Sequence, residues 1–336
     1  MEQEKIIDAF CFLQKELSNC ENNSKIQKAI EKTRENNPLL SYKEIVFQIK
    51  NLSLWLEKDS LICFANKYCF NQNPKTIAII CAGNIPCVGF HDILCTLLSG
   101  NKALCRLSSS DKFLLPVFAD ILIEKEPLLS KRIKFTDNII KGFDAVIATG
   151  SNNTNRYFDY YFSSYPNIIR HSRTSVAVLD NSQKDIEELF YDIFSFKGLG
   201  CRNVSKIFIP EGFDFSFLTD KFSKHSHLLL DNDKYMDNYN YQKAIMIMNN
   251  LPFIDLNSGL MVESKELFSP ISVVYYEYYK NINDVREYLE MEKENIQVVV
   301  SNIEGLNCYD LGQGQRPNIY DFADNRDTMQ FLCSLE

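Results

Sequence analysis

Residues 198–210 read Gly-Leu-Gly-Cys-Arg-Asn-Val-Ser-Lys-Ile-Phe-Ile-Pro. This stretch places Cys201 in a turn that two glycines loosen, directly before an apolar run that predicts a strand at 206–210. A thiol in such a turn lies beside Arg202 and within reach of backbone N–H groups, and these neighbours lower a thiol pKa. The position is typical of a cysteine nucleophile, although a structural cysteine buried in a loop has the same sequence signature.

The composition bounds the class of protein. A chain of 336 residues with 45% hydrophobic and 24% charged residues is typical of a soluble globular protein with two domains. The net charge of −8, with no block rich in Lys or Arg, argues against nucleic acid as a partner. No apolar run reaches the length of a membrane span, and the charged start lacks the apolar core of a signal peptide. The 11 cysteines include no C-x-x-C pair, so we expect a reducing, cytoplasmic location.

The hydrophobic pattern predicts an α/β fold after a helical start. Apolar residues recur at spacings of three and four through residues 1–70, which predicts helices. From Thr76 onward, short β-branched runs alternate with helical patterns, and this alternation predicts a parallel sheet with right-handed crossovers. The predicted strands are 76–82, 102–107, 144–148, 175–179, 206–210, 270–276 and 296–300, and the predicted helices between them are 90–98, 112–122, 185–196 and 284–291. A polar break at Asp180 predicts a domain boundary.

Several predicted strands end in residues that suit ligand binding, because ligands of open α/β sheets bind beyond the carboxyl ends of the strands. The amide of Asn84, after the first strand, suits a developing oxyanion, and it equally suits a turn that stabilises its own backbone. Arg106 ends the second strand and either faces a phosphate or remains a solvated charge. Gly150 and Ser151 precede a predicted helix start, whose N–H groups favour a phosphate.

Other motifs are weaker. Glu266 precedes a strand and either accepts hydrogen bonds from ribose hydroxyls or is an ordinary surface residue. The His225-x-His227 pair has no further clustered ligands, so we predict that the protein holds no metal. The pairs Gly198-x-Gly200 and Gly312-x-Gly314 are only fragments of a dinucleotide-binding fingerprint, and the first precedes a strand instead of following one.

Taken in chain order, these segments resemble the aldehyde dehydrogenase superfamily, and within it the LuxC-type acyl-CoA reductases. The resemblance runs from about Thr76 to the C-terminus, and its most specific pieces are 83–86, 148–158, 198–206, 320–324 and 327–329. It implies an aldehyde-dehydrogenase-like α/β fold with a Rossmann-like parallel-sheet cofactor domain and a smaller α/β catalytic domain. The expected parts are N-terminal helices with the NAD(P)-binding domain at 1–180, the catalytic domain at 181–302, and a tail at 303–336 that returns to the cofactor domain or to a neighbouring subunit.

The resemblance also implies roles for single residues. Cys201 matches the superfamily nucleophile, and Asn84 matches the asparagine that helps to form the oxyanion hole. The cofactor-binding residues that the resemblance implies are Gly150 and Ser151 at the nicotinamide cofactor, Glu266 and Phe268 at the nicotinamide ribose, and Arg106 at the adenosine ribose. Because Arg106 replaces the usual lysine and suits a 2′-phosphate, we expect NADPH to be preferred over NADH.

Two departures from the superfamily pattern matter. Asn155 stands where a second glycine is expected after Gly150, so the pyrophosphate of the cofactor is expected to sit differently. Arg170 stands where many members carry the glutamate that activates water. The missing base fits an acyl-enzyme that exchanges with a thiol instead of water. Arg170, His171 and Arg173 either attract CoA phosphates or form structural ion pairs.

The resemblance therefore implies a long-chain acyl-thioester reductase. It would reduce an acyl-CoA or acyl-protein thioester to an aldehyde through an acyl-cysteine, using NADPH. Expected partners are acyltransferase or synthetase subunits and further copies of this chain. Two alternatives stay open, namely an acyl-phosphate reductase of the same superfamily, and a cysteine acyltransferase or non-catalytic assembly subunit that never binds nicotinamide.

Overall fold

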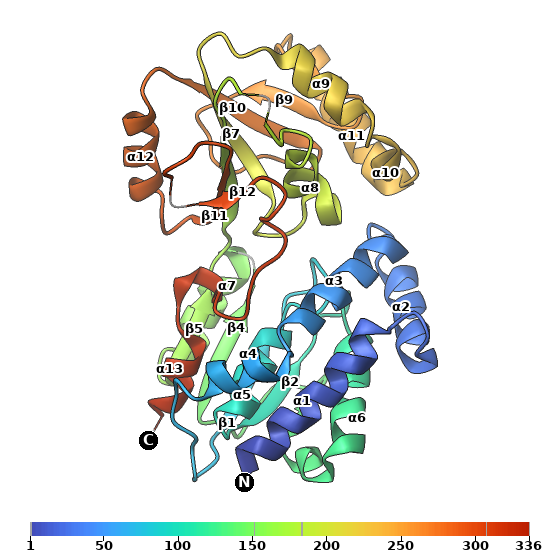
Figure 1. Ribbon diagram of the computed structural model, residues 1–336, viewed down its shortest axis with the longest axis vertical. Helices are drawn as coiled ribbons and strands as arrows, with labels where there is room; N and C mark the ends of the chain where they lie inside the picture. The colour runs from blue at the N-terminus through green and yellow to red at the C-terminus, as the bar shows by residue number, and fades with distance from the viewer. Residues whose placement is uncertain (1, 151, 183, 307, 336) are drawn as a thin grey trace. The chain divides into compact units, whose positions relative to one another are not determined.

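The computed structural model describes residues 2–150, 152–182, 184–306 and 308–335, and the chain forms two compact units. The first unit comprises Met1–Ser172 and Asn318–Glu336, and the second comprises Arg173–Pro317 (Figure 1). Ser151 is one of the residues outside the described ranges. None of the helices in those ranges combines the length and the apolar character that crossing a membrane requires.

The first unit begins with four amphipathic helices, as the sequence predicts. Ile6, Phe10 and Leu13 are fully or almost fully buried on one face of the first helix, and a capping box between Ser41 and Glu44 starts the third. The four helices are α1 (Glu2–Ser18), α2 (Ser24–Asn36), α3 (Tyr42–Leu54) and α4 (Lys58–Ala65).

A parallel sheet of five strands follows, in the order β3-β2-β1-β4-β5. Its strands are β1 (Thr76–Ile80), β2 (Lys102–Arg106), β3 (Ile133–Phe135), β4 (Ala145–Thr149) and β5 (Asn167–Arg170). The intervening helices are α5 (Phe90–Leu98), α6 (Leu114–Lys125), the 3₁₀ turn η1 (Pro127–Lys131) and α7 (Asn152–Phe162). From β1 the chain adds β2 and β3 on one side and β4 and β5 on the other, so the strand order reverses between the paired strands β1 and β4. A ligand is expected beyond the carboxyl ends of these two strands.

The second unit contains a seven-stranded sheet in the order β12-β11-β6-β7-β10-β9-β8, and its pairs are parallel except β8 with β9. Its strands are β6 (Thr174–Val178), β7 (Val204–Pro210), β8 (Ile254–Asp255), β9 (Leu260–Glu263), β10 (Val273–Tyr279), β11 (Ile296–Ser301) and β12 (Tyr309–Asp310). Its helices are α8 (Leu189–Phe194), the 3₁₀ turn η2 (Ser195–Gly198), α9 (Phe215–Ser223), α10 (His227–Leu230), α11 (Asp233–Met248) and α12 (Ile282–Met291). Val176, Val178 and Phe208 form part of the core between this sheet and α12.

The predicted α/β architecture with two sheet domains is confirmed, but the division of the chain differs from the prediction of 1–180, 181–302 and 303–336. The first division falls at Ser172 instead of Asp180, because β6 pairs with β7 and β11 and so belongs to the second sheet. Residues 303–317 also stay with the second unit, where β12 pairs with β11.

The C-terminal segment returns to the first unit from Asn318 onward. Two short helices lie in this segment, the 3₁₀ turn η3 (Ala323–Asn325) and α13 (Thr328–Cys333). Figure 1 shows α13, in red, within the unit that also contains α5, and the two helices are in contact. The amides of Asn71 and Asn101 donate to the carbonyl of Leu332 at 3.0 and 3.2 Å, so side chains of the first unit hold the end of this helix.

Candidate active site

Cys201 lies in the loop between η2 and β7. The residue is exposed, and hydrogen bonds hold the backbone of its loop in place. The Gly200 N–H donates to Asn203 Oδ1 at 2.8 Å, and the Cys201 carbonyl accepts from Ser175 Oγ at 2.9 Å. All 11 cysteines are thiols, and five of them are buried: Cys20, Cys81, Cys87, Cys95 and Cys105. Burial raises the pKa of each of these five thiols. The buried thiols therefore stay protonated, whereas Cys201 remains open to a substrate.

A left-handed turn leads the chain from α8 into the Cys201 loop. Phe196, Lys197 and Gly198 have φ angles of 52°, 57° and 76°. Only glycine adopts this conformation without strain, and each of the other two residues costs about 1–3 kcal/mol. Strained backbone of this kind persists only where the surrounding structure holds it in place.

The side chain of Asn203 supplies much of that restraint. Its Nδ2 donates to the carbonyls of Ser195 at 2.8 Å, Ile193 at 3.0 Å and Asp192 at 3.3 Å. These carbonyls belong to the C-terminal end of α8, where helix carbonyls have no partners of their own. Asn203 thus binds the end of α8 to the Cys201 loop. The sequence analysis assigned no role to Asn203. The one signal in the sequence was its position two residues after Cys201.

Arg202 contacts the segment at 309–314. Its guanidinium donates to the Gly314 carbonyl at 3.3 Å and lies 5.9 Å from the centre of the Tyr309 ring. The predicted neighbour of the nucleophile therefore connects the loop to residues 309–314.

The structure brings the segment of Glu266 and Phe268 next to the strand that follows Cys201. Ser205 Oγ donates to the Leu267 carbonyl at 2.6 Å, and the buried Lys206 ammonium donates to the Lys265 carbonyl at 2.9 Å. Leu267 is buried, whereas Glu266 and Phe268 are exposed. Cys201, Glu266 and Phe268 therefore all lie in the second unit. Glu266 and Phe268 are accessible to a ligand.

Asn84, Arg106 and Gly150 lie in the first unit, at the carboxyl ends of β1, β2 and β4. Asn84 is exposed in its turn, and Ser110 Oγ fixes that turn by donating to the Gly83 carbonyl at 2.7 Å. Arg106 is exposed at the last position of its strand. Asn84 and Arg106 are therefore accessible at the edge of the sheet where a ligand is expected.

Gly150 requires the absence of a side chain. A Cβ atom at this position would lie 2.9 Å from the Phe158 ring and 3.0 Å from Asn155 Oδ1. Asn155 is buried, and its Nδ2 donates to the Arg170 carbonyl at 2.8 Å, which binds α7 to β5. Among the described residues, its Oδ1 has no hydrogen-bond partner. The residue that replaces the second glycine thus serves the packing of its own unit, while Ser151 lies outside the described residues.

Arg170 is a structural ion pair. Its guanidinium binds both oxygens of Asp92 at 2.6 Å and donates to Thr328 Oγ1 at 3.1 Å, and the residue is 4% exposed. Burial disfavours its charge, but the attraction and hydrogen bonds of Asp92 outweigh burial and raise the pKa of Arg170. Of the two predicted roles, the ion pair is the one the structure bears out for Arg170, and a phosphate has no access to this guanidinium. Arg173, in the second unit, likewise donates to the carbonyls of Lys293 and Ile296.

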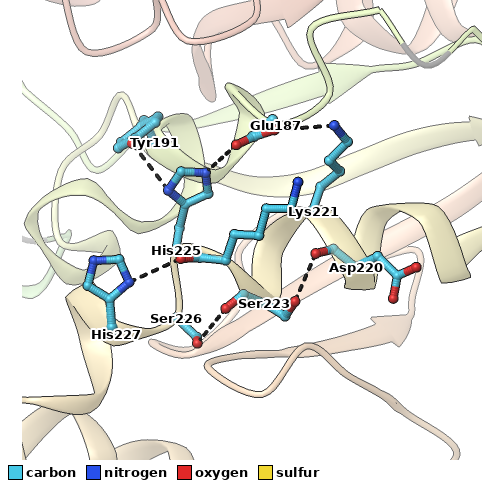
Figure 2. Close-up of polar contacts among 9 residues, drawn as sticks. Glu187, Tyr191, Asp220, Lys221, Ser223, His225, Ser226 and His227 are labelled. Carbon is cyan, nitrogen blue, oxygen red and sulfur yellow. Dashed lines mark hydrogen bonds and ion pairs between the residues drawn. The ribbon is translucent and has the colours of Figure 1, made fainter.

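The two histidines of the His-x-His motif have separate partners (Figure 2). His225 Nε2 lies 2.7 Å from Glu187 Oε1, and its Nδ1 lies 3.3 Å from the Tyr191 hydroxyl. His227 Nδ1 lies 3.1 Å from the Lys224 carbonyl instead. The hydrogen bond from His225, followed by that from Lys221, lowers the pKa of Glu187. Within the described ranges, no group of three or more His, Cys, Asp or Glu side chains suits a metal ion.

Comparison with solved structures defines the class of protein through its fold. Aldehyde dehydrogenase 21 from Physcomitrella patens, solved with succinate, shares a TM-score of 0.73 at 9% identity, over 99% of this chain and 84% of that one. Succinic semialdehyde dehydrogenase from Streptococcus pyogenes, solved with NADP⁺, gives 0.61 at 11% identity over 88% and 76%. An oxidoreductase from Marinobacter aquaeolei gives 0.65 at 10% identity over 89% and 72%. The fold is that of the aldehyde dehydrogenase superfamily.

The family follows from the sequence of this chain. Residues 43–225, more than half of its length, match the family described as acyl-CoA reductase (LuxC). No curated protein matches the chain. The chain is an enzyme of the LuxC acyl-CoA reductase family.

Proposed function

We propose that this enzyme reduces an acyl thioester to an aldehyde through a covalent intermediate on Cys201. The observation that carries the proposal is an exposed thiol in a loop whose backbone Ser175 and Asn203 hold in place. The Cys201 thiolate would attack the thioester carbonyl, forming a new carbon–sulfur bond. The bond from that carbon to the CoA sulfur then breaks, and CoA leaves as a thiolate that takes a proton from water.

Asn84 is the side chain that we propose for stabilising the oxyanion of this attack. Its amide is exposed in a turn that Ser110 holds, so it is accessible and restrained. An amide donor of this type contributes about 3–4 kcal/mol to transition-state stabilisation in other acyl transfers.

The residues of the chain fit a nicotinamide cofactor. Gly150 follows β4 at the point where the strand order reverses, and the start of α7 comes soon after it. We propose that Gly150 and Ser151 hold this cofactor together with Arg106, Glu266 and Phe268. When bound, it supplies the hydride that converts the acyl-cysteine to an aldehyde. The exposed guanidinium of Arg106 suits a ribose 2′-phosphate, so we propose NADPH as the cofactor.

The position of Arg170 supports thiol exchange over hydrolysis. A buried guanidinium that Asp92 holds charged has no lone pair with which to take a proton from water. The acyl-enzyme should therefore wait for reduction, or return to a thiol, without loss as free acid.

The proposed reaction requires an acyl donor and, by the resemblance, involves partner subunits. We propose an acyl-CoA or acyl-protein donor, acyltransferase or synthetase subunits that supply it, and a homo-oligomer. Three tyrosines on α7, Tyr157, Tyr160 and Tyr161, are 66%, 78% and 65% exposed and support self-association. Light scattering of the purified chain beside Tyr160→Glu would test this surface, and an unchanged mass would remove it as the interface.

A substrate panel tests the proposed reaction. The purified chain is mixed with NADPH or NADH and with acyl-CoA or acyl phosphate of matched chain length, while aldehyde and free CoA thiol are both measured. We expect aldehyde and CoA in equal amounts, with NADPH as the better donor. Activity only with acyl phosphate would favour the acyl-phosphate reductase. Absence of nicotinamide binding in an equilibrium titration would favour an acyltransferase or an assembly subunit.

A further inference from the structure

Asp192 is a buried carboxylate in the otherwise apolar helix α8. It is 0% exposed, and both of its oxygens accept backbone N–H groups, from Gly312 at 2.6 Å and from Gly314 at 2.9 Å. Within the described ranges it takes part in no ion pair. Burying a carboxylate with only backbone partners costs free energy, which directs attention to the segment that it binds.

This contact explains the Gly312-x-Gly314 motif. Gly312 has a φ angle of +82°, and a Cβ atom there would lie 2.8 Å from atoms of Glu188. A Cβ atom at Gly314 would lie 2.9 Å from Asp192 Oδ1. The two glycines therefore let the backbone approach the carboxylate closely enough for both N–H groups to bind it.

The same segment reaches the nucleophile loop. The Gly314 carbonyl accepts from Arg202 Nη1 at 3.3 Å, and Arg202 adjoins Cys201. On the other side of the cysteine, the Gly200 N–H donates to Asn203 Oδ1 at 2.8 Å, and Asn203 Nδ2 in turn donates to the backbone carbonyl of Asp192 at 3.3 Å. Both chain neighbours of Cys201 are thus connected to Asp192, one through Gly314 and one through Asn203.

We propose that Asp192 is a positioning residue for Cys201, because its carboxylate fixes residues 312–314 and this segment holds Arg202 and the nucleophile loop. The proposal deepens the proposed function and rests on Cys201 as its nucleophile. Asp192 acts through Gly314 and Arg202 and does not touch the substrate.

Protonation of Asp192 should loosen this restraint. Burial raises its pKa to about 7 against the opposing effect of the two N–H groups, and Glu188 adds to the rise. Among the described residues, Glu188 and Arg202 are charged groups that face this segment. In the protonated acid one oxygen becomes a hydroxyl, which is a poorer acceptor, so one of the two N–H bonds weakens. The segment is therefore held most firmly above pH 7.

The effect on stability has the opposite sign. The pKa of Asp192 is raised above its unfolded value near 4. Its contribution to folding stability is therefore complete below about pH 4 and is lost as the pH rises through about 7. Positioning and stability thus change in opposite directions with pH at this residue.

The test compares Asp192→Asn with Gly314→Ala, and with Asp220→Asn as a control that changes an exposed carboxylate of the same unit. Rates of Cys201 alkylation by iodoacetamide and of acylation by an acyl-CoA are followed by peptide mass spectrometry between pH 6 and 9. Peptide resolution separates Cys201 from the exposed Cys63 and Cys69. The ionisation of the Cys201 thiol is read from the pH profile of alkylation for each variant, so the ratio of wild-type to variant rate, corrected for ionisation, reports on positioning.

We expect Asp192→Asn to slow both reactions about tenfold at pH 8, the effect of one lost hydrogen bond, and by less at pH 6. Gly314→Ala should show the same loss, and Asp220→Asn none. A ratio near one at every pH for both variants, or one that does not change with pH, would overturn the proposal. If Asp192→Asn fails to fold, the ratio of the wild-type rate to the Gly314→Ala rate between pH 6 and 9 still tests the proposal. Failure of the wild type to acylate would refute the proposed function alone, because the alkylation rates would still test Asp192.

Discussion

Cys201 lies exposed in a loop whose backbone Ser175 and Asn203 hold, whereas Arg170 lies buried with its own guanidinium held by Asp92. In the first region the polar side chains bind backbone atoms, so the thiol stays accessible while its place is fixed. In the second region they bind the functional group itself, so its charge is neutralised inside the core. Hydrogen bonds to the backbone thus leave the Cys201 side chain accessible for reaction, whereas hydrogen bonds to the Arg170 side chain give it a structural role.

The largest expected effect is at Cys201. Cys201→Ala should lower the rate of aldehyde formation by about four orders of magnitude, because no neighbouring group replaces the nucleophile. The measurement is kcat with acyl-CoA and NADPH, together with circular dichroism to verify the fold. Cys69→Ala, which changes another exposed cysteine, should keep full activity. Substantial activity in Cys201→Ala would show that Cys201 is not the nucleophile, and the contrast between a reactive Cys201 and a structural Arg170 would fail.

Arg170 should matter for folding instead of for nucleophilic attack. Arg170→Met leaves the Asp92 carboxylate buried without its partner, which should lower the free energy of unfolding by about 3–5 kcal/mol. Urea denaturation measures this loss, and Arg326→Met, at an exposed arginine, serves as control. The double variant Asp92→Leu with Arg170→Met should recover much of the stability. A single variant as stable as the wild type would show that the ion pair is not structural.

Arg106 gives the smallest effect and refines the comparison, because it is an exposed arginine at a strand end of the same sheet as Arg170. Arg106→Ala should weaken NADPH binding by about 1–3 kcal/mol and NADH binding by less, since only NADPH carries the 2′-phosphate. Fluorescence titration measures both affinities. Lys102→Ala, at the opposite end of β2, should change neither. Equal weakening of the two cofactors would return Arg106 to the role of a solvated charge.

The sequence was informative where structure is local. Periodicity predicted the first helices, most of the longer strands and the loop of Cys201, because these depend on neighbours along the chain. It missed β5, whose residues 167–170 show no clear alternation, and it misplaced β6, because pairing partners decide which sheet a strand joins.

Contacts between distant residues could not be predicted. Asp92 and Arg170 are 78 residues apart, and Asp192 binds Gly312 and Gly314 across 120 and 122 residues. A buried partner at such a distance leaves no pattern in a single sequence. The resemblance placed Arg170 at the position of a catalytic base, but only the structure shows which side chain neutralises it.

The most direct test of the central claim is to locate the acyl group and follow its fate. The enzyme is mixed with isotopically labelled acyl-CoA in the absence of cofactor, and peptide mass spectrometry then follows the label in buffer and after addition of CoA. We predict one acyl group on Cys201 that clears at least a hundredfold faster with CoA than in water, since Arg170 stands where the resemblance places the general base that hydrolysis needs. Label on another residue, or rapid release as free acid without CoA, would contradict the account.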